Sequence, residues 1–178
     1  MPNNYYDIDD IVTDGQKIPS TFQLSVPNLG YLQGNIGQEV RANSKADLPL
    51  WLASSLATQD IPGLPDTAFI EISSPPEFSP KVLNALKTDP INVDVRLLSS
   101  VYFKLAERWL SLLDDPELLK ILVETVKRRS MEIADMSNNP RGAQENSEFI
   151  FKLDETEMKL YKMTQEAVKD MKNWSVGK

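Results

Sequence analysis

The first third of the chain alternates apolar and polar residues. Phe22, Leu24 and Val26 fall on one side of an extended chain, with polar residues between them. A period of two is typical of a strand with one buried face. Residues that favour turns separate these apolar pieces. We therefore predict strand segments within residues 18–32, including a piece that starts at Tyr31, and at residues 39–43 and 68–72.

Residues 48–53, with the sequence LPLWLA, form the most apolar run in the chain. Proline suits the first turn of a helix, where its missing N–H would have no partner, and Asp47 is a suitable N-cap. We predict a short helix from this run to about Thr58 that closes the core of a small domain. Trp51 is expected to be buried in that core, so Trp51→Ala would cost roughly 3–5 kcal/mol.

Beyond the prolines at positions 75 and 76, apolar residues recur every three or four positions. This spacing is typical of amphipathic helices, and Ser79 before Pro80 and Asp115 before Pro116 are suitable helix starts. The pattern predicts helices at residues 80–87, 92–113, 116–136 and 147–174, with a polar loop at 137–147. The predicted fold class is α+β: a small N-terminal β-rich domain with one short helix, residues 1–75, followed by a C-terminal all-α helical bundle, residues 76–178.

Three apolar stripes run along the longer predicted helices. Arg129 interrupts the second stripe, and Glu157 and Thr164 interrupt the third, whose spacing is close to a coiled-coil heptad. A long helix with apolar residues on more than one face packs on its own bundle or on a partner, and both roles stay open. The stripes contain Leu98, Tyr102, Leu105, Trp109 and Leu112; Leu119, Leu122, Val126, Ile133 and Met136; and Ile150, Leu153, Leu160, Ala167, Met171 and Trp174.

Composition narrows the possible chemistry. The 178 residues include neither cysteine nor histidine, which removes disulfides, thiolate nucleophiles, Ser-His-Asp triads and the commonest general base. The net charge is −7, and residues 1–75 contain nine acidic residues against three basic ones. Such a domain repels phosphate backbones and suits a basic protein surface. Neighbouring carboxylates fit helix starts and exposed faces, so we expect no catalytic residue, no cofactor and no metal site.

Two other classes of function compete with an interaction role. Lys127, Arg128 and Arg129 form the one basic cluster; a run of three is typical of a solvated helix face, and direct DNA binding through it is the alternative. The acidic net charge argues against that alternative. A carboxylate-dependent enzyme would need a buried cleft with two convergent acids.

Several segments of the chain match one known family when they are taken in order. They are residues 5–11, 18–19, 26–32, 48–53 and 81–90, and the ending from residues 151–158 to Trp174. Together they resemble the third Psf subunits of the eukaryotic GINS complex, in their fungal versions. The resemblance covers nearly the whole chain and implies a helical A domain preceded by a small β-rich B domain. It also implies a non-catalytic scaffold in a heterotetramer, located in the nucleus, that joins the MCM helicase ring and one further helicase factor in DNA replication.

The resemblance supplies partners but no catalytic motif. We expect contacts with three sister subunits, with the MCM ring and its additional factor, and with DNA indirectly, but none with a membrane or a small-molecule substrate. An acidic helical adaptor of another nuclear assembly is the alternative. The expected partner-binding residues are Asp7, Asp9 and Asp10 toward the motor, and Tyr102, Leu105, Trp109, Leu153, Leu160, Met171 and Trp174 toward sister subunits.

Overall fold

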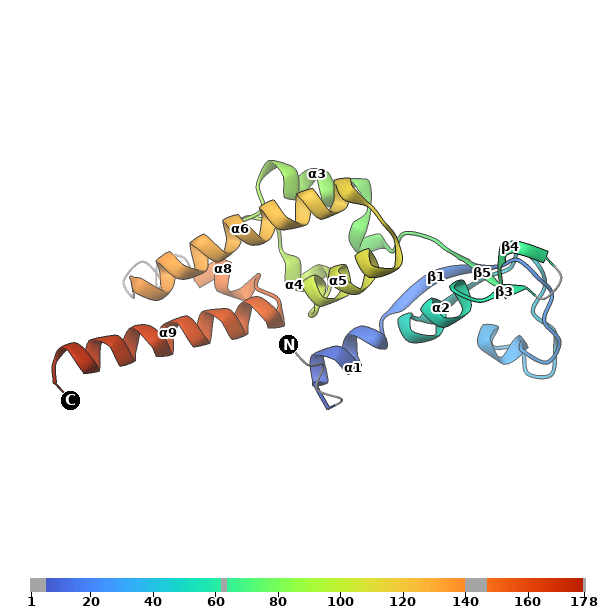
Figure 1. Cartoon of the computed structure of the whole chain (residues 1–178), viewed down its shortest axis with the longest axis horizontal. Coiled ribbons are helices and arrows are strands. Elements are labelled where there is room, and N and C mark those ends of the chain that lie inside the picture. The colour runs from blue at the N-terminus through green and yellow to red at the C-terminus, as the bar shows by residue number, and fades with distance from the viewer. Residues whose placement is uncertain (1–5, 62–63, 140–146, 178) are drawn as a thin grey trace. The chain divides into compact units, whose positions relative to one another are not determined.

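The computed structural model describes residues 6–61, 64–139 and 147–177. The chain divides into two compact units, residues Met1–Phe78 and Ser79–Lys178, and each unit has its own interior. The first unit contains a small antiparallel sheet and the second is helical (Figure 1), which confirms the predicted α+β fold class.

The N-terminal unit consists of short elements. In chain order they are α1 (Ile8–Asp14), β1 (Lys17–Phe22), the 3-10 helix η1 (Gly30–Gln33), β2 (Lys45–Pro49), α2 (Leu50–Ala57), β3 (Asp60–Ile61), β4 (Leu64–Ala68), β5 (Ile70–Ile72) and the 3-10 helix η2 (Pro76–Phe78).

Strand β1 is the centre of the N-terminal unit. It lies between β2 and β5, and both neighbours run antiparallel to it. Ile18, Ser20 and Phe22 alternate inward and are buried, with the period of two of a strand. The predicted alternation at Phe22, Leu24 and Val26 is wrong beyond Phe22, because β1 ends there and Val26 forms only an isolated bridge. Helix α2 contacts all three strands of the sheet. The interior therefore forms between one sheet face and one helix.

The apolar run at residues 48–53 begins in a strand, not in a helix. Leu48 pairs with Ile18 across β2 and β1, and Asp47, the predicted N-cap, lies within β2. Pro49 has an extended backbone, with φ −58° and ψ 144°, and precedes the helix. The prediction of a helix opened by Asp47 and Pro49 is therefore wrong in its start, because the sheet uses these residues for pairing.

The expected burial of Trp51 is also wrong. Because α2 starts at Leu50, it turns Leu50 and Ala53 toward the sheet, and both are buried. Trp51 lies one residue further round the helix and is 56% exposed. The anchors of this run are Leu48 and Leu50, which fill the interior that we had assigned to Trp51.

The segment between β1 and β2 has less strand than predicted. Residues 31–32 lie in η1, and residues 39–43 form no named strand: Val40 makes an isolated β-bridge with Val26, and Asn43 N donates to the Phe22 carbonyl at 2.7 Å. Gly30 donates its N–H to the carbonyl oxygen of Gln38 at 2.9 Å, and a Cβ at Gly30 would lie 2.6 Å from that oxygen. The loop therefore closes on itself at a position that only glycine fits.

The helical unit begins with the two helix starts that the sequence predicts. Pro80 is the first residue of the first helix, after Ser79, and the Asp115 side chain accepts from the backbone N–H groups of Glu117 and Leu118. The elements are α3 (Pro80–Thr88), α4 (Val95–Leu98), α5 (Tyr102–Leu112), α6 (Pro116–Asn138), α8 (Ser147–Phe151) and α9 (Glu155–Ser175).

Two helices that we predicted as continuous are each divided. The predicted helix at 92–113 becomes α4 and α5, with extended Ser99 between them, and the predicted helix at 147–174 becomes α8 and α9. The two breaks bond to each other: Phe103 N donates to the Asp154 carboxylate at 3.1 Å, and Glu155 N donates to the Ser100 carbonyl at 2.9 Å. Each break therefore supplies a hydrogen-bond acceptor for a backbone N–H group near the other break.

Helices occupy both ends of the predicted polar loop at residues 137–147. Residues 137 and 138 still belong to α6, and residue 147 opens α8. Residues 140–146 of this prediction lie outside the described residues.

Candidate interaction surfaces

The interior of the helical unit is built around the side chain of Arg129, which is fully buried. Its guanidinium forms two hydrogen bonds with the Glu157 carboxylate, at 2.6 and 2.8 Å, and lies over the Phe149 ring at 5.0 Å from its centroid. A planar guanidinium matches a carboxylate in this two-bond geometry. The remaining N–H groups donate to the carbonyl oxygens of Pro90, Val93 and Lys152 at 2.8, 3.1 and 3.1 Å.

Asp154 adds a second buried acid next to this pair. Its carboxylate accepts from Glu157 N at 2.7 Å and from Phe103 N, while the Glu157 carboxylate accepts from Asp154 N at 3.2 Å, which completes a capping box at the start of α9. Burial raises the pKa of Asp154 to about 6, against the two backbone donors, which lower it. Burial therefore destabilises the charged carboxylate more than its hydrogen bonds stabilise it.

Arg129, Glu157 and Asp154 together form what we call the charged centre. It joins α6 to the first turn of α9, to the segment before α4 and to the first turn of α5. Next to it, Ile133, Met136, Phe149 and Leu153 form an apolar cluster. The charged centre is inaccessible to a ligand, so its role is to hold α6, α8 and α9 in their arrangement.

The basic cluster of the sequence does not form one surface. Arg129 is buried in the charged centre, and Arg128 pairs with Glu124 at 3.1 Å on the exposed side of α6. Lys127 is exposed. The alternative of direct DNA binding through these three residues therefore loses one cation to the interior and has a second one paired.

Four of the expected partner-binding residues lie in the interior. Tyr102, Leu105, Trp109 and Leu153 are each at most 3% exposed, so their side chains pack within the helical unit. The stripe of the predicted helix at 92–113 is a core stripe. These four side chains offer a partner almost no exposed surface. The burial therefore contradicts the expected direct contact with a partner.

Three of the expected residues lie on an exposed apolar stripe of α9. Leu160, Met171 and Trp174 are exposed, Trp174 by 82%, and Met163 between them is exposed as well. With Ala167 these residues recur at spacings of three, four, four and three, so they lie on one face of the helix. The side of α9 that carries Met158 and Tyr161 packs toward α6 instead. We call Leu160, Met163, Ala167, Met171 and Trp174 the α9 stripe.

The three expected acidic residues occupy different environments in and before α1. Asp7 is the N-cap, and its side chain accepts from Asp9 N at 3.1 Å; Asp9 is buried, whereas Asp10 is half-buried. Helix α1 ends at Asp14 with Gly15 as its C-cap. Its face with Ile8 and Ile11 is exposed.

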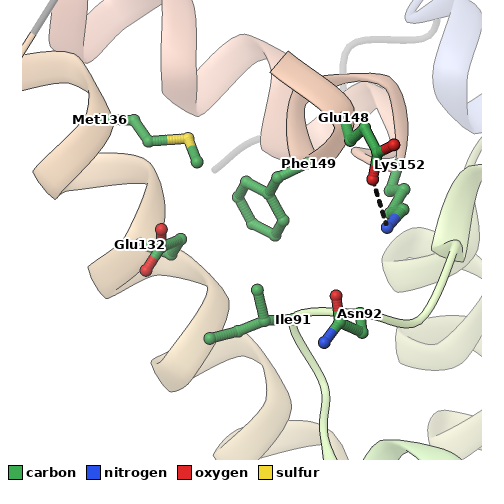
Figure 2. A pocket seen from close by; sticks show the side chains of 7 residues that line it. All are labelled: Ile91, Asn92, Glu132, Met136, Glu148, Phe149 and Lys152. Atoms are coloured by element: carbon green, nitrogen blue, oxygen red, sulfur yellow. Dashed lines mark ion pairs between the residues drawn. The ribbon is translucent and has the colours of Figure 1, made fainter. Parts of the chain in front are cut away.

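A hollow lies beside the charged centre. It measures about 180 Å³ and lies between α6, α8 and residues 91–92, with Phe149 pointing into it (Figure 2). Its ion pair, Glu148 with Lys152 at 3.9 Å, is largely exposed on the Glu148 side. Small-molecule sites usually measure about 300–1,000 Å³, and among the described residues no group of acids is placed to hold a metal ion.

Sequence reasoning missed the charged centre, although it contained a signal. Arg129 and Glu157 each interrupt an apolar stripe, one with a cation and the other with an anion. Two opposite charges on the core faces of two helices can pair, whereas either one alone would be costly to bury. Neither interruption predicts the pair by itself, because each charge is satisfied only by the other.

A two-unit α+β chain with exposed apolar helix faces is typical of a subunit that binds other proteins. Residues 6–58 match the family model described as PSF3 N-terminal domain, and residues 77–176 match the one described as GINS complex protein helical bundle domain. The chain belongs to the PSF3 family of GINS complex proteins.

Curated relatives match over nearly the full length of both chains. The protein of Debaryomyces hansenii named DNA replication complex GINS protein PSF3 is 42% identical over 174 residues, covering 98% of each chain. Proteins of the same name from Schizosaccharomyces pombe and Saccharomyces cerevisiae are 40% and 36% identical, covering 96% and 98% of this chain and 96% and 99% of their own. Both units therefore share one origin with these relatives.

Proposed function

We propose that the chain is a non-catalytic structural subunit of a heterotetrameric GINS complex in the nucleus, where it supports the replicative MCM helicase during initiation and elongation of DNA replication. The observation that carries this proposal is the match of both units, over 96–98% of the chain, to relatives named as GINS proteins of DNA replication.

The α9 stripe supports a role in assembly. Its apolar residues extend over fifteen positions, from Leu160 to Trp174, and the two ends are about 21 Å apart along the helix. The heptad-like spacing suits a second helix laid alongside, with its side chains packed between these. We assign this surface to a sister subunit, because an exposed apolar stripe of this length marks an interaction site.

The acidic N-terminal unit supports a contact with the helicase. Residues 1–75 carry nine acidic residues against three basic ones, so this unit attracts a basic protein surface and repels DNA. We assign Asp7 and Asp10, at the start of α1, to contact with the MCM ring or its additional factor, and DNA is reached only through the assembly. Among the described residues none of the helices has the length and apolarity to cross a membrane.

Assembly is tested by co-expressing the chain with its three sister subunits and analysing the mixture by size exclusion with light scattering. The wild-type chain elutes in a 1:1:1:1 complex. Met171→Asp with Trp174→Asp places two charges on the α9 stripe and releases the chain from the complex. Lys162→Asp, on the opposite face of α9, is the matched control and stays in the complex. A wild-type chain that elutes alone would sink the proposal and favour an adaptor of another assembly.

The helicase contact needs variants that keep α1 folded. Because Asp7 caps α1 and Asp9 is buried, we keep Asp9 and combine Asp7→Ser, which retains a capping oxygen, with Asp10→Ser. The purified tetramer that contains this variant is expected to bind the MCM ring and its additional factor more weakly, most clearly at low salt. A tetramer that falls apart would instead assign these residues to the structure of the chain.

A further inference from the structure

Helix α1 reverses the usual placement of polar and apolar side chains on a surface helix. Its inward side carries Asp9, which is 9% exposed, and Thr13, which is fully buried. On its outward side Ile8 and Ile11 are 73% and 59% exposed, and Val12 beside them is 39% exposed. A surface helix normally turns its apolar residues toward the interior. We call Ile8, Ile11 and Val12 the α1 face.

Local hydrogen bonds explain how the polar side of α1 can face inward. The Thr13 hydroxyl donates to the Asp9 carbonyl at 2.6 Å, so this buried hydroxyl has an acceptor. Directly after the helix, the Gln16 carbonyl accepts from Leu50 N at the start of α2 at 2.8 Å, and α1 contacts α2. The polar side of α1 therefore packs on the N-terminal unit, and the α1 face is left uncovered.

The side-chain charges within and next to α1 are negative. Asp10 and Asp14 are half-buried within the helix, Asp7 is its N-cap, and the first sixteen residues of the chain contain no lysine or arginine. Asp14 is the last residue of α1, where a negative charge is unfavourable to the helix dipole, and the last turn has no basic residue to offset it. This acid therefore does not stabilise α1, but it attracts a cation that approaches the α1 face.

An apolar face bordered by acids selects one kind of occupant. A second copy of the chain would bring the same acids against these, and a nucleic acid or an anionic lipid surface would be repelled as well. An apolar small molecule needs a concave site, whereas the outward side of a helix is convex. A basic amphipathic helix meets both conditions, because its apolar stripe covers Ile8 and Ile11 and its basic edges lie along the acids.

We propose that the α1 face binds a basic amphipathic helix of a helicase component, with lysine or arginine side chains of that helix placed along Asp10 and Asp14. This rests on the function proposed above and adds to its acidic contact an apolar one. The apolar contact supplies affinity because it removes exposed isoleucine side chains from water, and the acids steer and orient the incoming helix.

The experiment uses the purified tetramer and measures its binding to the MCM ring and to the additional factor in separate titrations. Ile8→Ala combined with Ile11→Ala removes most of the α1 face, and alanine keeps the helix because it is the best helix former. Ile36→Ala, at a position 91% exposed in the loop between η1 and β2, is the matched control. Size exclusion checks that each variant tetramer assembles.

The variant with alanine at both positions of α1 is expected to bind one helicase component at least about 10-fold more weakly, the effect of losing a hot spot. This loss persists at high salt, because apolar contacts are not screened. Asp14→Asn weakens binding of the same component, with a loss that shrinks at high salt. Ile36→Ala binds as wild type does.

A pair of single variants tests the charge of the occupant. Ile11→Lys and Ile11→Glu remove the same apolar side chain and add opposite charges, so a basic occupant binds the Ile11→Lys tetramer more weakly than the Ile11→Glu tetramer. The reverse order would overturn the inference, because it would mean an acidic occupant.

Two further results would overturn it. The tetramer with Ile8→Ala and Ile11→Ala could bind both helicase components as wild type does, or it could fail to assemble, which would place the α1 face inside the tetramer. Failure of the wild-type tetramer to form, or to bind either component, would instead overturn the proposed function.

Discussion

The N-terminal unit closes its interior with apolar side chains from a sheet and one helix, whereas the helical unit closes its interior around the Arg129–Glu157 ion pair. In the first unit Ile18, Phe22 and Leu48 are at most 2% exposed. In the second, three charged side chains, Arg129, Asp154 and Glu157, are buried as well. The helical unit thus buries charges that must satisfy one another.

The two interiors differ in how they stabilise the fold. An apolar interior gains free energy from burial alone, roughly 25 cal/mol per Å². A buried ion pair gains little net free energy but makes the loss of one partner very costly. The helical unit therefore depends on a few specific hydrogen bonds to hold α6, α8 and α9.

The largest expected effect is the loss of one partner in the charged centre. Arg129→Met leaves the Glu157 carboxylate buried without its cation and should lower the free energy of unfolding by about 3–5 kcal/mol. Urea denaturation followed by far-UV circular dichroism measures the change. Arg128→Met, one residue away and exposed, is the control and should change it by less than about 0.5 kcal/mol.

A double variant sharpens the same comparison. Arg129→Met combined with Glu157→Leu removes both charges, so it should recover most of the loss caused by Arg129→Met. If the double variant is no more stable than the single one, the hydrogen bonds of Arg129 to the Pro90, Val93 and Lys152 carbonyls decide the stability instead of the ion pair.

In the N-terminal unit, two neighbouring apolar residues should differ sharply. Leu48 is 1% exposed and fills the interior, so Leu48→Ala should cost roughly 2–5 kcal/mol. Trp51 lies three residues later and mostly outside the core, so Trp51→Ala should lower the free energy of unfolding by less than about 1 kcal/mol. Thermal unfolding of both variants gives the comparison. Equal losses would mean that α2 does not have the orientation described.

The third expected effect concerns how the stability of the helical unit depends on pH. Because the pKa of Asp154 is raised to about 6 from 3.8 in the unfolded chain, the folded chain binds an extra proton between these values. Stability contributed by Asp154 therefore increases as pH falls from about 6 to about 4. Relative to Asp154→Asn, the wild type should gain up to roughly 3 kcal/mol in this window, measured by urea denaturation at pH 4, 5, 6 and 7.

A surface acid provides the contrast in sign. The side chain of Asn92 donates to Asp89 at 2.6 Å and lowers the pKa of Asp89. Asp89 therefore contributes stability that is lost as pH falls through its lowered pKa. Asp89→Asn should shift the curve of stability against pH in the opposite direction and much less.

For Asp154, parallel curves of stability against pH for wild type and Asp154→Asn would contradict the burial of a charged carboxylate.

The smallest effect on folding is expected on the α9 stripe. Met171→Lys should change the free energy of unfolding by less than about 0.5 kcal/mol, because the residue is 67% exposed in the isolated chain. It should also reduce aggregation of the isolated chain, measured by light scattering against concentration, since an exposed apolar stripe promotes association. A large loss of stability would mean that the stripe is packed within the chain.

Much of the fold follows from local signals. A strand that includes Phe22, the helix starts at Pro80 and Pro116, and the change of period after residue 75 all follow from the sequence, because strand and helix periods and proline preferences act within a few residues. Leu160, Met171 and Trp174 were also placed correctly on one helix face, since that placement depends only on their spacing.

The tertiary structure decided the remaining features. Whether residues 48–49 extend a sheet or open a helix depended on β1 as a pairing partner, and the breaks before α5 and α9 depended on hydrogen bonds between them. Burial also separated Tyr102 and Leu105 from Leu160 and Met171, although all four lie on apolar stripes.

The sequence by itself determined the elements and the faces on which residues lie, because these depend on neighbours in the chain. Only the tertiary structure decided that Arg129 and Glu157 form a core while Val123 and Trp174 stay at the surface. The physical reason is that a charge is buried only where a partner from a distant segment satisfies it, and an apolar residue is buried only where another element covers it.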